Sequence, residues 1–168
     1  EPVALHVLED QRCVFFPLFM TGYVIADLLL DNEWYGVEQV LIGSASSKTG
    51  FSTAAFVREA GFDGAIVGLT RQQNVPFTEA LDCYDSVVPY CDLETLDQAP
   101  AAYMDIAGDV AVRFRLHWHL NDAAVCTLLV GATHWDQFAK SLDGGSLPGS
   151  EPEVFFAPVQ IEKRDAEW

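Results

Sequence analysis

The fold is decided by residues 37–70, VEQVLIGSASSKTGFSTAAFVREAGFDGAIVGLT. Residues 37–43 are mainly apolar and β-branched, which is typical of a buried strand. After a polar turn, residues 49–60 have helical spacing and stop at Gly61, and residues 65–69 form a second apolar run. This order predicts a βαβ unit, in which a helix joins two parallel strands across one face of a sheet.

The same alternation continues on both sides of this unit. Further strands are expected at 86–89, 102–106, 123–130 and 154–157, and further helices at 18–31, 74–82, 108–120 and 158–168. Strands that alternate with helices predict an α/β fold, a Rossmann-like doubly wound parallel sheet with helices on both faces. We expect residues 1–35 to be an N-terminal extension with a leading helix, and residues 36–168 to be a nucleotide-binding domain.

Composition excludes two classes of protein. Half of the 168 residues are hydrophobic, which is enough for a full core and contradicts global disorder. Nine basic residues stand against 25 acidic ones, for a net charge of −16. A surface this acidic repels phosphate backbones, and no run of Lys or Arg compensates, so nucleic-acid binding is excluded.

The longest apolar stretch, residues 15–30, is interrupted by Pro17, Gly22 and Asp27. It predicts a core helix and no membrane span, because a span needs about 18 uninterrupted apolar residues. The cysteines are far apart in a chain that is large enough to be stable without disulfide bonds. Free thiols in a reducing intracellular or organellar compartment are therefore expected. They are Cys13, Cys83, Cys91 and Cys126.

The turn after the first strand is the first place to search for a ligand, because open α/β sheets bind ligands at the carboxyl ends of their strands. Residues 43–50 read GSASSKTG. A nucleoside-triphosphatase loop ending at Lys48 and Thr49 would need glycines at positions 42 and 47, where Ile and Ser stand. A dinucleotide loop fits better, with Gly50 as its third glycine and small residues at the first two positions.

Polar groups in this turn can compensate for the two missing glycines. The hydroxyls of Ser46, Ser47 and Thr49, the Lys48 ammonium and the amides of a helix start all favour a bound anion. The alternative is an ordinary polar turn that caps a helix.

The end of the second strand indicates which dinucleotide would bind. NAD-binding domains usually carry an acidic residue there, whereas residues 68–74, GLTRQQN, contain none. The Arg71 guanidinium suits a 2′-phosphate by bidentate pairing, so NADP is favoured over NAD. The alternative is a solvent-exposed surface arginine.

Several motifs resemble, in order, the cofactor domain of zinc-free medium-chain dehydrogenases/reductases of the quinone-oxidoreductase branch. They are PLFMTGYVIADLL, EQVLIGSASSKTGFSTAAFV, IVGLTRQQN, SVVPY, YMDIAGD and LLVGATHWD. SASSKT, CYD-x-V and FFAP-x-Q-I-x-K-R resemble more closely an uncharacterised family of such reductase-like proteins, known as a domain of unknown function. The resemblance covers residues 14–168 and implies an NADP(H)-binding domain of an oxidoreductase that acts on a carbonyl or a quinone.

The resemblance also implies roles for single residues. Pyrophosphate contacts would come from Ser46, Ser47, Lys48 and Thr49, a 2′-phosphate site from Thr70, Arg71 and Asn74, an adenosine contact from Tyr90, and a nicotinamide site from Gly108, Gly131, Ala132 and Thr133. Asp82 departs from the pattern of that family, because it stands where a glycine usually follows the helix expected at 74–82. The separate GroES-like catalytic domain of such reductases is not expected within these residues, so a catalytic domain or a larger assembly is the expected partner.

Histidines provide the other chemical candidates. His134 follows the fifth strand and would protonate a reduced carbonyl or quinone oxygen as the catalytic residue; the alternative is a packed loop histidine. His117 and His119 are candidate ligands for a zinc ion. Residues two apart on a helix point about 200° apart and cannot share a metal, so no metal is expected. Asp105 and Asp109 would either touch a ligand or cap the following helix.

Two hypotheses of function remain. One is an NADP-dependent oxidoreductase completed by a partner domain. The other is a non-catalytic accessory or scaffold subunit that keeps the fold with a degraded nucleotide loop; an ATP- or flavin-binding module is a third, lesser alternative. An open phosphate cradle at residues 44–49 facing Arg71 favours the enzyme, and a cleft filled by side chains favours the scaffold.

Overall fold

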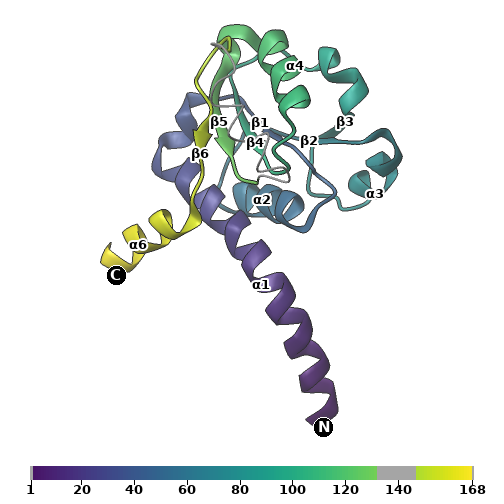
Figure 1. Cartoon of the computed structure of the whole chain (residues 1–168), viewed down its shortest axis with the longest axis vertical. Coiled ribbons are helices and arrows are strands. Elements are labelled where there is room, and N and C mark those ends of the chain that lie inside the picture. Colours follow the sequence, from purple (N-terminus) through teal and green to yellow (C-terminus); the bar gives the residue numbers. More distant parts are fainter. Residues whose placement is uncertain (1, 132–146, 168) are drawn as a thin grey trace.

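A six-stranded sheet forms the centre of the computed structural model, which describes residues 2–131 and 147–167 (Figure 1). The strands are β1 (Gln39–Ile42), β2 (Ala65–Thr70), β3 (Ser86–Pro89), β4 (Ala101–Asp105), β5 (Ala124–Leu129) and β6 (Glu153–Val154). The helices are α1 (Pro2–Asp31), α2 (Lys48–Glu59), α3 (Val75–Glu79), α4 (Val110–Leu120) and α6 (Ala157–Glu167). Short 3-10 turns are η1 (Glu33–Gly36), η2 (Gln72–Asn74), η3 (Tyr90–Thr95) and η4 (Asn121–Ala123).

All strands are parallel, in the order β3-β2-β1-β4-β5-β6. The predicted doubly wound α/β fold is therefore confirmed. On β1, Val40 is in register with Ile66 of β2 on one side and with Ala102 of β4 on the other. The chain changes its direction of winding between β1 and β4, and sheets of this kind bind ligands in the crevice at such a switch point.

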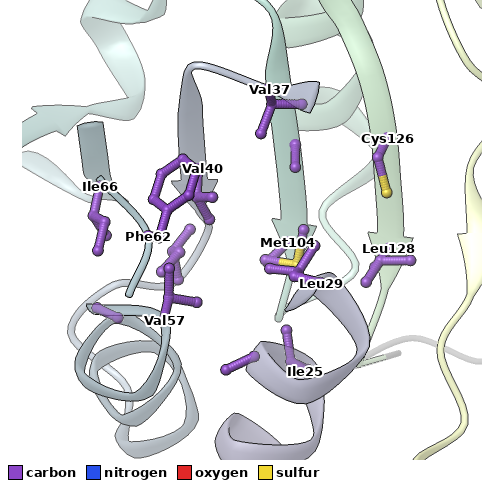
Figure 2. Close-up of a cluster of buried hydrophobic side chains, with 14 of the residues drawn as sticks. Ile25, Leu29, Val37, Val40, Val57, Phe62, Ile66, Met104, Cys126 and Leu128 are labelled. Atoms are coloured by element: carbon purple, nitrogen blue, oxygen red, sulfur yellow. The ribbon is translucent and has the colours of Figure 1, made fainter. Parts of the chain in front are cut away.

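The two faces of the sheet bury different layers. Val40 faces the cluster that α1 and α2 cover (Figure 2). Ile42 belongs to the same cluster, whereas Leu41 between them faces the cluster that α4 and η3 cover. Every residue of β1 is buried, because helices lie on both faces. The expected apolar runs thus become strands that are covered on both sides.

The helix α1 is longer than predicted, since it continues through Pro17 from Pro2 to Asp31. Proline removes one main-chain hydrogen bond from a helix, and that loss does not end α1, so the helix start predicted at residue 18 was wrong. Within α1, Gln11–Asp31 is long and apolar enough to cross a membrane by length and composition, a test that core helices also pass. The carboxyl-terminal half belongs to the core, where Ile25 and Leu29 are fully buried (Figure 2).

Close contact with α2 fixes α1 at Gly22. A Cβ at this position would lie 2.4 Å from the Ser52 hydroxyl oxygen and 2.7 Å from the Thr53 backbone nitrogen. The aromatic pairs Phe19–Phe51 and Tyr23–Phe56 follow along the same contact, with ring centroids 5.8 and 5.6 Å apart. The first turns of α1 project beyond this contact (Figure 1).

Candidate functional site

A cavity of about 180 Å³ opens at the carboxyl ends of the strands, beside the β1–β4 switch point. Segments that follow four strands contribute to it. Its lining residues are Ser44 and Ser46 after β1, Thr70, Arg71 and Asn74 at and after β2, Tyr90 after β3, and Ala107 and Asp109 after β4. The topology therefore brings residues that are up to 65 positions apart into one site.

The turn after β1 is held by hydrogen bonds from both of its neighbours. Ser44 has a φ of +51°, and its backbone N–H donates to the Tyr90 phenol oxygen at 2.7 Å. The backbone N–H of Ala45 donates to the Leu69 carbonyl, and the Tyr84 hydroxyl donates to the Ala45 carbonyl at 2.9 Å. These contacts fix the turn, and because of them the backbone N–H groups of Ser44 and Ala45 already have hydrogen-bond partners.

The start of α2 retains the character of a dinucleotide loop in two respects. The Ser47 hydroxyl accepts a hydrogen bond from the Gly50 N–H at 3.0 Å and so caps the helix. Gly50 is sterically required, since a Cβ there would lie 2.6 Å from the Ser44 carbonyl oxygen. Within the described residues, the backbone N–H groups of Lys48 and Thr49 have no hydrogen-bond partner, so this helix start can bind an anion.

Hydrogen-bond donors dominate the wall formed after β2. The Asn74 amide donates to the Ser46 hydroxyl oxygen at 3.2 Å, and the Thr70 hydroxyl lies 3.4 Å from the same oxygen. Arg71 is exposed, and its guanidinium has no hydrogen bond or ion pair within the described part of the chain. Its five donors are free for a ligand.

The opposite wall belongs to the loop after β4. Asp109 caps α4, because its Oδ1 accepts hydrogen bonds from the backbone N–H groups of Ala111 and Val112. Burial raises the pKa of the Tyr90 phenol, which therefore stays protonated and keeps its O–H as a donor. The cavity thus combines donors on one side with a single carboxylate on the other.

The structure brings five of the predicted residues together in this cavity: Ser46, Thr70, Arg71, Asn74 and Tyr90. Ser47 and Thr49 lie at the start of α2 behind it, and the Lys48 ammonium lies 5.3 Å from the centre of the Phe15 ring of α1. Gly108 and Gly131 lie in the loops after β4 and β5. Ala132, Thr133 and His134 lie outside the described residues.

Sequence reasoning had placed Ser44 only within the expected phosphate cradle at residues 44–49, had not assigned Ala107 to the site and had left the role of Asp109 open. Their positions directly after strands were the available signal, because all such segments meet at one edge of a parallel sheet. The left-handed backbone of Ser44 gave no signal, since serine rarely adopts it.

The two histidines of α4 point to different partners. His117 is fully buried between the Pro148 carbonyl and the Thr127 hydroxyl, at 2.8 and 3.0 Å. His119 contacts the Leu96 carbonyl with its Nε2 at 2.8 Å. Across residues 2–131 and 147–167, His, Cys, Asp and Glu side chains form no cluster that could hold a metal ion.

Solved structures with the same fold include three proteins that hold a nicotinamide dinucleotide. Escherichia coli K-12 YhdH with bound NADPH has a TM-score of 0.57 and 15% identity over 88% of this chain and 47% of its own. The yhdH oxidoreductase of Salmonella enterica with NADP has a TM-score of 0.58 and 14% identity over the same shares. Bacillus subtilis yhfP with NAD bound reaches a TM-score of 0.50 and 14% identity over 84% and 46%. This chain thus spans about half the length of these structures.

Sequence comparison gives a family. The family described as "Protein of unknown function (DUF2855)" matches residues 3–168, which is nearly the whole chain. No curated protein matches.

Proposed function

This chain belongs to the family described as "Protein of unknown function (DUF2855)", and we propose that it is an NADP(H)-binding domain of an oxidoreductase. The observation that carries the proposal is the cavity at the carboxyl ends of β1 and β2, where Ser46, Arg71, Asn74 and Tyr90 meet. The fold shared with structures that hold NADPH or NADP supports it.

The donor set fits a phosphate group. A guanidinium, a side-chain amide and hydroxyls can all donate to phosphate oxygens, and the guanidinium can do so bidentately. Thr70 ends β2 and Arg71 follows it, with no carboxylate at this strand end to hold a ribose 2′-hydroxyl. Thr70, Arg71 and Asn74 would hold the 2′-phosphate, which favours NADP over NAD.

The start of α2 would hold the pyrophosphate. The free amides of Lys48 and Thr49 and the positive end of the helix dipole favour negative charge there. The loops after β4 and β5 would then border the nicotinamide half, where Gly108 and Gly131 lie. When bound, the nicotinamide supplies hydride transfer, and the protein orients it and excludes water.

A carbonyl or a quinone is the proposed hydride acceptor, and His134 is the proposed proton donor to its reduced oxygen. Since the chain spans about half of the solved structures that it matches, we propose that a further catalytic domain or a larger assembly completes the substrate cleft.

A non-catalytic scaffold is the second candidate, and the Ser44 turn favours it. The Tyr90 phenol already occupies the Ser44 amide, and the Ala45 amide bonds to Leu69. In addition, a volume of about 180 Å³ is below the roughly 300–1,000 Å³ of typical small-molecule pockets. A scaffold subunit would keep these contacts and bind no nucleotide.

Titration of the protein with NADPH and with NADH, followed by calorimetry or nicotinamide fluorescence, tests the proposal. We expect NADPH to bind at least about tenfold more tightly than NADH, since Arg71 offers charge-assisted hydrogen bonds only to the 2′-phosphate. Absence of binding for both at millimolar concentration favours the scaffold. Equal affinities for NADPH and NADH contradict only the proposed 2′-phosphate site and not the binding of a dinucleotide.

A further inference from the structure

Asp105, at the carboxyl end of β4, is a charged residue inside the core. It is 1% exposed, and its ion-pair partner Arg113 on α4 is 3% exposed. Taking two charges out of water is costly, and such a pair is often no more stable than well-packed apolar side chains. Its location at the sheet edge that carries the cavity therefore suggests a role other than stability.

The carboxylate of Asp105 holds the loop after β4. Its Oδ1 accepts hydrogen bonds from the backbone N–H groups of Gly108 at 2.8 Å and Asp109 at 3.3 Å, and its Oδ2 accepts one from Arg113 at 2.8 Å. Gly108 has a φ of +69°, a left-handed conformation in which this loop turns toward α4. Asp109, fixed in this way, lines the cavity.

The backbone carbonyl of Asp105 holds the residues directly after β5. It accepts hydrogen bonds from the N–H groups of Val130 at 3.0 Å and Gly131 at 3.3 Å. Gly131 lies so close to the β4 loop that a Cβ would stand 2.1 Å from the Ile106 carbonyl oxygen. Asp105 thus holds the loop after β4 and the first two residues after β5 through separate atoms.

We propose that Asp105, held by Arg113, is a positioning residue for the nicotinamide half of the bound dinucleotide. This inference rests on the proposed function, because the loops after β4 and β5 are the ones that would border the nicotinamide. Arg113 acts indirectly: it fixes the carboxylate orientation in which Oδ1 faces Gly108 and Asp109. The adenosine half would lie on the other side of the cavity, against Arg71 and Asn74, and would not depend on the pair.

The double variant Asp105→Leu/Arg113→Met tests the proposal by removing both charges while it keeps apolar bulk. Exchange of a buried ion pair for apolar side chains is commonly tolerated, so the variant is expected to fold. NADPH and adenosine 2′,5′-bisphosphate are the probes, since the second carries only the adenosine half. We expect NADPH affinity to fall about tenfold, equivalent to about 1.4 kcal/mol, and bisphosphate affinity to change less than about twofold.

Arg113→Lys is the matched control, because it keeps the charge at this position and should retain most of the NADPH affinity. Undiminished NADPH binding by the folded double variant, or an equal loss of affinity for both probes, would overturn the positioning role. Either result would leave the proposed nucleotide-binding function untouched. If the wild-type protein binds neither probe, the proposed function itself is wrong and the inference falls with it.

Hydrogen exchange on the wild-type protein provides a measurement that needs no variant. The amides of Gly108, Asp109 and Gly131 should gain protection with NADPH and much less with the bisphosphate. Equal protection by the two probes contradicts the proposal.

Discussion

The Tyr90 phenol oxygen accepts a hydrogen bond from the backbone N–H of Ser44 at 2.7 Å and thereby joins the turn after β1 to the segment after β3. Ser44 has a left-handed backbone, with a φ of +51°, which is uncommon for a residue with a side chain. The contact satisfies an amide that the turn leaves without a backbone partner and defines the wall of the cavity between Arg71 and Asp109.

Tyr90→Phe removes the acceptor of this bond and keeps the ring. We expect the free energy of unfolding to fall by about 1 kcal/mol, because a typical hydrogen bond contributes about 0.5–1.5 kcal/mol net. Denaturant unfolding followed by circular dichroism measures the change. Tyr23→Phe is the matched control, since Tyr23 is 48% exposed on α1 and its loss of a hydroxyl should cost almost nothing.

Arg71→Ala should weaken NADPH binding by about 10- to 100-fold, the effect of losing one or two hydrogen bonds to a charged group. NADH affinity should change less than about twofold, because NADH lacks the 2′-phosphate. Isothermal titration calorimetry with both nucleotides measures the difference. Arg12→Ala on α1 removes the same charge outside the cavity lining and should affect neither. A loss of equal size for NADPH and NADH would contradict the assignment of Arg71 to the 2′-phosphate.

Periodicity predicted the fold because the signals of a parallel sheet are local. The strand 86–89 was predicted with its exact bounds, and buried runs such as 65–69 became β2. The leading helix was predicted from 18–31, and its earlier turns were missed, because Pro17 is a strong but not decisive helix breaker.

The site was predictable only where side-chain chemistry follows directly from sequence position. Arg71 and Asn74 could be assigned because they follow a strand and can donate to an anion. The position of the Lys48 ammonium could not be predicted in this way, because it depends on the contact with Phe15 of α1, which is distant in the sequence. Asp82 adopts a φ of +53°, so this aspartate takes the left-handed conformation for which glycine is usual, and the departure from the expected pattern leaves the turn intact.

Acid should destabilise the domain through His117. Burial lowers the pKa of this histidine, so below about pH 6.5 the unfolded chain binds a proton that the folded protein does not. The free energy of unfolding is therefore expected to fall as the pH decreases from about 6.5. Protonation would also cost the acceptor atom Nε2 its bond from the Thr127 hydroxyl, if Nδ1–H donates to Pro148 as the geometry requires.

His117→Gln should flatten this dependence, because an amide can donate to the Pro148 carbonyl and accept from Thr127 without titrating in this range. Unfolding in urea at several pH values between 7 and 5 measures the slope. The wild-type protein measured at the same pH values is the reference. A wild-type slope in the His117 variant would contradict the prediction.

A second acid-sensitive contact joins α6 to α1, and its titrating group is the Asp31 carboxylate. Asp31 is bonded by Lys163 at 2.6 Å and by Gln160 at 2.9 Å, and Arg164 pairs with both Asp31 and Asp27. The Lys163 ammonium is the main cause that lowers the pKa of Asp31 from 3.8 to about 2. A lowered pKa stabilises the folded state above pH 3.8, and this contribution is lost as the pH falls toward 2.

Asp31→Asn should therefore lower stability at pH 7 and leave the acid-induced loss between about pH 4 and 2 shallower than in the wild type. Hydrogen exchange of α6 amides at pH 7 would locate the effect, since α6 contacts the domain through Asp27 and Asp31 of α1. Asp63→Asn, in an exposed turn before β2, is the matched control. If α6 exchanges no faster in the Asp31 variant than in the control, the carboxylate does not hold the helix, and apolar contacts such as Phe155 against the α1 core must do so instead.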